Sequence, residues 1–218
     1  MATPIKFGTD GWRAIIAADF TVENVARVTE ATGIWIKARF EQPTVVLGHD
    51  CRFAGELFME TAAKVLIAQG IRVKLSRGFV STPMISLAAH QLGCEIGIII
   101  TASHNPPSYN GFKLKAKFGG PLEPEKINEV EALIPDVSSL NFQSIELEQA
   151  VQTGQLEEID METRYVDHVK ANFDLNAIDQ SGLQLMYDAM YGAGQRVLPR
   201  ILPKVALLHC DPNPSFMG

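Results

Sequence analysis

Apolar and polar positions along the first 140 residues predict strands and helices in turn. Short β-branched runs read as covered strands, and apolar residues at helical spacing between them read as helices. The strands are expected at residues 44–50, 71–76 and 94–100, and the helices at about 21–40, 55–69, 81–93 and 123–134. Such alternation predicts an α/β fold in which a layered sheet is covered by helices.

The stretch Gly97–Lys115, "GIIITASHNPPSYNGFKLK", changes character halfway. Three consecutive isoleucines end a strand that is expected to pack on both faces. A polar loop with two prolines follows, and Phe112–Leu114 restarts an extended pattern. Because ligand-binding groups of such folds lie in loops at the carboxyl ends of strands, this loop is the first candidate site.

The second half of the chain predicts a linker and an incomplete second domain. Residues 141–158 are less periodic and rich in Ser, Gln and Glu, whereas 159–218 starts a new α/β pattern. This part has a helix at about 161–172, a strand at 183–190, a glycine turn and the strand "KVALLH". Two clear strands are fewer than a free-standing sheet normally has, which leaves self-association through this domain open.

Composition excludes several classes of protein. The 218 residues are 46% hydrophobic and 20% charged with a net charge of -6, so bulk nucleic-acid binding is not expected. No apolar run approaches membrane-spanning length, and the start lacks a signal-peptide pattern. The three cysteines have no CxxC spacing, which favours reduced thiols and a cytoplasmic location.

Ser103 is the candidate nucleophile in the polar loop. A reactive serine needs a base, a positive charge or a metal nearby. His104 is adjacent, Lys113 lies on the next strand, and backbone N–H groups of a curled loop can receive an anion. The alternative is a proline turn capped by small polar residues.

A second polar stretch, "KFGTDGWRA", precedes the first long helix. It brings Thr9, Asp10 and Arg13 together, and a guanidinium can hold two phosphate oxygens at once. The alternative is a common Thr-Asp-Gly turn followed by a solvated arginine.

Taken together, "FGTDGWR" and "TASHNPPSYNGFK" resemble the phosphohexomutases, the phosphoglucomutase and phosphomannomutase group. "GHDCRF" is similar to the Asp-Thr-Arg turn of this family, and "DAMYGAGQ" is similar to its second-domain glycine turn. The resemblance implies that Ser103 carries a phosphoryl group. The serine gives this group to a hexose phosphate, and the resulting bisphosphate reorients and returns its other phosphoryl group.

The resemblance also implies roles for the neighbouring side chains. His104 would orient the phosphoryl group, Arg13 would hold the loop, and Asn105 would shape it. Lys113 would be the general acid or base, although Lys115 and Lys117 alternate with it on the strand. Thr9 and Asp10 join Arg13, Asn105 and Lys113 as phosphate-binding candidates, while Ser103 would ligate Mg²⁺ through its phosphate.

The run His49–Arg52 and the glycines after Asp188 are better explained as structural turns than as a metal, thiol or nucleotide site. No Asp-x-Asp-x-Asp run, which binds magnesium in the family, occurs in the sequence. The family's third and fourth domains are also missing, so we expect an amino-terminal portion, a mixed sheet over 1–140 and a partial second domain.

Two functions stay open at this point. The chain is part of a mutase that uses Mg²⁺ and a hexose 1,6-bisphosphate primer, or it is a phosphosugar-binding or phosphoryl-accepting module without turnover. A serine phosphatase would need metal ligands that are not visible. The form "NPPxYNGxK" favours glucose or mannose phosphates over glucosamine phosphate by resemblance.

Overall fold

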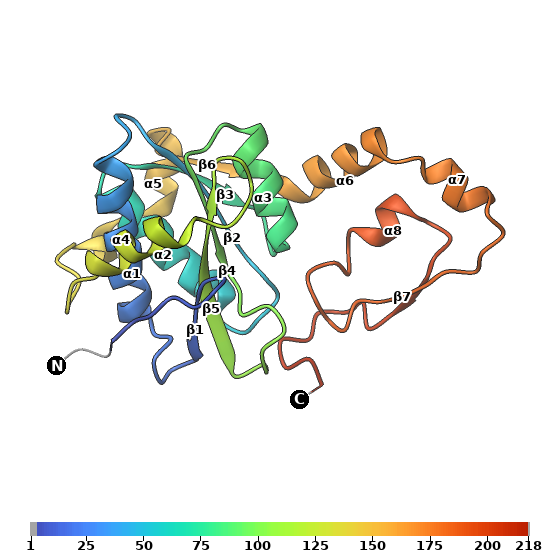
Figure 1. Cartoon of the computed structure of the whole chain (residues 1–218), viewed down its shortest axis with the longest axis horizontal. Coiled ribbons are helices and arrows are strands. Elements are labelled where there is room, and N and C mark those ends of the chain that lie inside the picture. Colours follow the sequence, from blue (N-terminus) through green and yellow to red (C-terminus); the bar gives the residue numbers. More distant parts are fainter. Residues whose placement is uncertain (1–3, 218) are drawn as a thin grey trace.

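The computed structural model describes residues 4–217. Its first unit is a six-stranded mixed sheet between two layers of helices, shown nearly edge-on in Figure 1. The strand order is β1-β5-β4-β2-β3-β6; β5 is antiparallel to both of its neighbours, and the other pairs are parallel. The strands are β1 (Trp12–Ile15), β2 (Thr44–His49), β3 (Arg72–Ser76), β4 (Ile96–Ile100), β5 (Tyr109–Ala116) and β6 (Leu156–Ile159). The predicted layered mixed sheet is confirmed.

Helices cover both faces of this sheet (Figure 1). One face packs against α1 (Val22–Lys37), α2 (Gly55–Ala68), α4 (Pro124–Ala132) and α5 (Leu147–Gln152). The other face packs against α3 (Thr82–Gln91) and α6 (Met161–Asn172). Thr21 caps α1 as its sequence position predicts, because its Oγ1 accepts a hydrogen bond from the Asn24 amide at 3.2 Å.

Strand β4 is buried on both faces, as its isoleucine run predicts. Ile98 and Ile100 join the core beneath α1 and α2, whereas Ile99 joins the core beneath α3. Side chains alternate across a strand, so each face of the sheet receives its own isoleucines. The loop that follows β4 therefore starts from a rigid position.

The segment 141–158, predicted as a linker, forms ordered structure. It contains η1 (Phe142–Ser144), α5 and most of β6, and β6 pairs in parallel with β3. The sequence pattern did not predict this strand because β6 lies at the edge of the sheet, where only Leu156 is buried and the other positions are not strongly apolar.

The second unit is small and open. It holds α6, α7 (Leu175–Gln180), β7 (Met186–Asp188), α8 (Leu198–Ile201) and β8 (Ala206–Leu208), with β7 and β8 forming a parallel two-stranded sheet. The strand predicted at 183–190 is shorter in the structure, where β7 spans only Met186–Asp188. Both β7 and β8 are largely exposed. Across residues 4–217, no helix has the length and apolar character to cross a membrane.

Candidate functional site

The loop after β4 presents Ser103 at the surface. Ser103 is exposed and has a φ of 57°, a left-handed conformation that is uncommon for residues other than glycine. Its amide donates to Thr101 Oγ1 at 3.0 Å, and the Thr101 hydroxyl donates to Asp50 Oδ2. The backbone of the serine is thereby anchored at an exposed position of the loop.

Arg13 reaches this loop from β1. The antiparallel pairing of β1 with β5 places Arg13 opposite Gly111, and its Nη1 donates to Asn105 Oδ1 at 2.9 Å. A Cβ added at Gly111 would lie 2.5 Å from the Thr101 carbonyl oxygen, so the close approach of these strands requires glycine. The predicted neighbours Arg13 and Asn105 therefore meet in the structure.

Asp10 lies between two buried ammonium groups. Lys113 Nζ is 2.6 Å from Asp10 Oδ2 and Lys115 Nζ is 3.2 Å from Oδ1, with the two lysines only 3% and 5% exposed. Burial acts to raise the pKa of Asp10, but the hydrogen bond and charge of Lys113, helped by Lys115, bring it below the ordinary value of 3.8. Lys117 instead pairs with Glu95 and is exposed. Lys113 and Lys115 thus share Asp10, whereas Lys117 lies beyond Ala116, where β5 ends.

His104 and Thr9 complete the set of predicted residues. Both are exposed, and His104 follows Ser103 directly at the surface of the loop. The structure therefore brings Arg13 to Asn105, which lies two residues after Ser103 on the same loop, and separately brings Asp10 to Lys113 of β5.

Arg52 is a site residue that sequence reasoning missed. We interpret "GHDCRF" as a structural turn, yet the Arg52 guanidinium is buried and donates to four carbonyl oxygens of the serine loop. The available signal was an arginine in the loop after an apolar strand, next to Asp50. That signal does not say which distant segment the guanidinium binds.

The other side chains of this turn do not form a metal or thiol site. Among residues 4–217, no group of three or more His, Cys, Asp or Glu side chains is placed to hold a metal ion. Burial, and then the charge of Asp50, raise the pKa of Cys51 to about 12. This raised pKa disfavours the thiolate form of Cys51.

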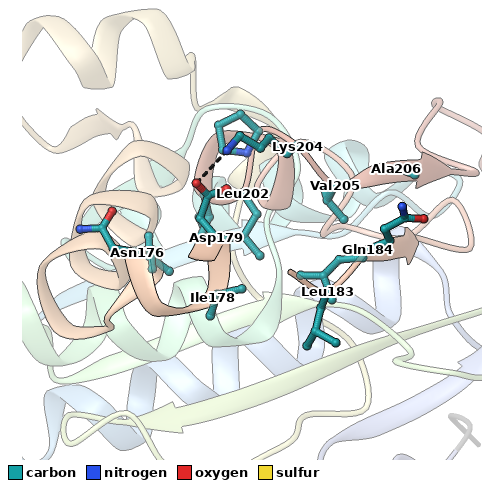
Figure 2. Close-up of a pocket in the computed structure, with 13 residues that line it drawn as sticks. Asn176, Ile178, Asp179, Leu183, Gln184, Leu202, Lys204, Val205 and Ala206 are labelled. Carbon is teal, nitrogen blue, oxygen red and sulfur yellow. Dashed lines mark hydrogen bonds and ion pairs between the residues drawn. The ribbon is translucent and has the colours of Figure 1, made fainter. Parts of the chain in front are cut away.

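A cavity of about 350 Å³ adjoins the serine. Its lining includes Ser103 and Thr101, the start of α3 at Thr82, and Gly192 and Ala193 of the second unit. A larger cavity, about 630 Å³, lies elsewhere, between α7 and the end of α8. Figure 2 shows its lining, including the Asp179–Lys204 ion pair at 2.7 Å, and none of the predicted site residues lines it.

Comparison with known proteins assigns both units. A family model described as phosphoglucomutase/phosphomannomutase, alpha/beta/alpha domain I, matches residues 4–140. The corresponding model for alpha/beta/alpha domain II matches residues 163–218. Together the two models cover most of the chain.

Individual relatives agree with these models. A phosphoglucomutase/phosphomannomutase of Thermococcus kodakarensis is 32% identical over 96% of this chain and 46% of its own length. A phosphoglucosamine mutase of Wolinella succinogenes is 29% identical over 91% of this chain and 44% of its own. The chain thus spans about half the length of the curated relatives it matches.

Solved structures share the fold. A crystal structure from Thermus thermophilus, described as that of a phosphomannomutase, is 35% identical with a TM-score of 0.88. It covers 100% of this chain and 48% of the other. The pp63/parafusin structure from Paramecium is 18% identical with a TM-score of 0.83, and the match covers 100% of this chain and 46% of the other. At this identity, the match shows a similar fold and nothing more.

Proposed function

The chain belongs to the phosphoglucomutase/phosphomannomutase family, and from this premise we propose that Ser103 carries the phosphoryl group exchanged with a hexose phosphate. The observation that supports this most directly is the exposed Ser103 in a left-handed backbone position, on a loop held by Arg13 through Asn105. Such a serine offers its hydroxyl to a substrate while its backbone stays anchored.

The proposed reaction consists of two phosphoryl transfers, one from Ser103 to the sugar and one from the sugar back to Ser103. In the forward step the bond from phosphorus to Ser103 Oγ breaks and a bond to a sugar hydroxyl oxygen forms, which yields a hexose bisphosphate. The proton of that hydroxyl passes to the neutral amine form of Lys113, the proposed general base, which thereby becomes the ammonium that pairs with Asp10. The bisphosphate then reorients, and its other phosphate is returned to Ser103 Oγ as Lys113 gives the proton to the departing sugar oxygen.

The neighbouring groups supply positioning and charge. Phosphoryl transfer depends mainly on orientation and on stabilising the charge that spreads over the phosphate oxygens. Arg13 and His104 are the proposed partners of those oxygens, while Asn105 holds the Arg13 guanidinium in place. Asp10 keeps Lys113 at its position, and the nearby Thr9 adds a hydroxyl to the same turn.

Magnesium, which the resemblance implies, is not provided for by these residues alone. A hard cation of this kind takes oxygen ligands, and the phosphate on Ser103 is the one that the proposal supplies. Because residues 4–217 contain no group of three or more His, Cys, Asp or Glu side chains that could hold a metal, no step is routed through the ion.

The test is the transfer of phosphate to the chain itself. The purified protein is incubated with glucose 1,6-bisphosphate, and its intact mass is followed over time. We expect the wild type to gain one phosphoryl group on Ser103, and Ser103→Ala to gain none. Ser108→Ala, which alters another exposed serine of the same loop, serves as the matched control and should be labelled normally. Peptide mapping that places the phosphate on Ser108 or Ser81 would refute the assignment.

A second candidate is a phosphoryl-accepting module that does not turn over. The lack of a metal-binding group among residues 4–217 favours it for this chain by itself. Conversion of glucose 1-phosphate to glucose 6-phosphate, with added magnesium and bisphosphate, separates the two functions. We expect labelling of Ser103 without measurable turnover, whereas sustained turnover would support a complete mutase.

The substrate and location are part of the same proposal. The loop form "NPPxYNGxK" supports glucose or mannose phosphates, while the relatives include phosphoglucosamine mutases. Labelling rates with the bisphosphates of glucose, mannose and glucosamine would rank the three sugars. Three free cysteines support a cytoplasmic location.

A further inference from the structure

Arg52 lies behind the serine loop with its guanidinium surrounded by backbone carbonyls. Nη2 donates to the carbonyl oxygens of Ser103 at 2.9 Å and Asn105 at 2.6 Å. Nη1 donates to those of Pro106 at 2.8 Å and Tyr109 at 3.0 Å. The loop thus curls around one cation that is only 5% exposed.

The carboxylate of Asp50 ties this cation to the amide side of the same serine. Asp50 Oδ1 accepts from the Arg52 amide at 3.0 Å, and Oδ2 lies 3.4 Å from Arg52 Nε. Oδ2 also accepts the Thr101 hydroxyl, which in turn accepts the Ser103 amide. The N–H and the C=O of Ser103 are therefore both bound by one cluster of side chains, made up of Asp50, Arg52 and Thr101.

This cluster accounts for the conformation of Ser103. A left-handed backbone costs a non-glycine residue about 1–2 kcal/mol, so it persists only where surrounding contacts outweigh that cost. Holding the Ser103 N–H toward Thr101 and its C=O toward Arg52 provides such contacts. The described peptide bonds are not cis, so the His104 N–H points away from Arg52, on the side opposite the Ser103 C=O.

We propose that Arg52 is a positioning residue that holds the 103–109 loop in the conformation that presents Ser103 for phosphoryl transfer. It acts through the loop backbone, because its η nitrogens bind carbonyl oxygens and its side chain is buried. Arg13 differs, since it contacts a loop side chain from a half-buried position. The inference rests on the proposed phosphorylation of Ser103, but its claim about the loop can be tested separately.

Lysine cannot replace Arg52 in this arrangement. A guanidinium presents five N–H donors in a rigid fork, whereas an ammonium presents three donors from a single atom. Two separate nitrogens of Arg52 each serve two carbonyls, which one ammonium nitrogen cannot reach together. The variant Arg52→Lys therefore keeps the positive charge but loses the two-nitrogen donor arrangement that binds the four carbonyls.

The first measurement is hydrogen exchange, which does not depend on phosphorylation. Amides of the 103–111 segment should exchange faster in Arg52→Lys and Arg52→Ala than in the wild type, while β2 and β4 stay protected. Arg77→Ala, at an exposed arginine paired with Glu158, is the control and should leave the loop unchanged. Unchanged exchange in the loop of a folded Arg52 variant would overturn the inference. If Arg52→Ala does not fold, Arg52→Lys carries the same comparison.

The second measurement is the rate of Ser103 labelling by glucose 1,6-bisphosphate. We expect a loss of about 100-fold in Arg52→Ala, the order reached when a reacting group is displaced by about 1 Å. Guanidinium chloride at low millimolar concentration should restore at least part of this rate, and ammonium chloride should not. Lack of rescue by guanidinium in a folded Arg52→Ala would contradict the positioning role. If neither the wild type nor Arg77→Ala is labelled, the proposed function fails, while hydrogen exchange still decides the role of Arg52.

Discussion

Replacing Asp10 with asparagine tests whether one carboxylate neutralises the two buried lysines beside the candidate site. Asp10 contacts Lys113 at 2.6 Å and Lys115 at 3.2 Å, and both ammonium groups lie on β5 with little exposure. The Asp10→Asn variant keeps the shape of the side chain and removes its charge. Two ammonium groups would then share a neutral amide oxygen.

The expected loss of stability follows from burial. Breaking a fully buried ion pair by removing one partner costs about 3–5 kcal/mol because the other charge stays buried and unpaired. The Asp10 side chain is 36% exposed, so solvent screens part of this interaction. We therefore expect a decrease of about 2 kcal/mol in the free energy of unfolding.

Urea unfolding followed by tryptophan fluorescence measures this decrease. Trp12 and Trp35, the two tryptophans of the chain, are buried in the core of the first unit and report on it selectively. With a slope of about 2 kcal/mol per molar urea, the midpoint should fall by about 1 M. Glu41→Gln, which neutralises an exposed acid, is the control and should leave the midpoint unchanged. A decrease below about 0.5 kcal/mol in Asp10→Asn, the range of an ordinary surface change, would refute the reasoning.

The ion pairs of Asp10 with Lys113 and Lys115 also predict how the stability of the protein depends on pH. The pKa of Asp10 is lower in the folded protein than its ordinary value of 3.8, since Lys113 and Lys115 outweigh the opposing effect of burial. Its contribution to stability is therefore fully present above pH 3.8 and is lost as pH falls through the lower folded-state pKa. The difference in stability between wild type and Asp10→Asn should be constant at neutral pH and shrink in acid.

Three further outcomes are expected. Arg13→Lys should slow Ser103 labelling by about tenfold despite the retained charge, because an ammonium does not reproduce the guanidinium fork that donates to Asn105; an unchanged rate would remove Arg13 from the site. Gly111→Ala should destabilise the first unit by about 2–3 kcal/mol, since the new Cβ meets backbone oxygen, and a neutral result in urea unfolding would contradict that close approach. Cys51, whose pKa is raised to about 12, should resist iodoacetamide at pH 8 in the native protein. Rapid alkylation at that residue would contradict the raised pKa.

Local patterns in the sequence were sufficient for most elements of the first unit, but not for β1, η1, α5 or β6. The isoleucines of β4 predict a strand covered on both faces, and Thr21 predicts the start of α1, because burial and capping are decided by residues close in sequence. The same patterns place Ser103 in a loop at the end of a strand. They underestimate β6, whose edge position buries too few side chains to leave an apolar pattern.

Tertiary structure decided which of these residues meet. Periodicity shows which side of a strand is buried, but it does not identify the neighbouring strand or the register, which depend on contacts distant in sequence. Insertion of β5 between β1 and β4 brings Arg13 opposite Gly111 and places Asp10 against Lys113. The adjacency of β2 and β4 likewise carries Arg52 beneath the serine loop, where one guanidinium binds carbonyls 51 to 57 residues away in sequence.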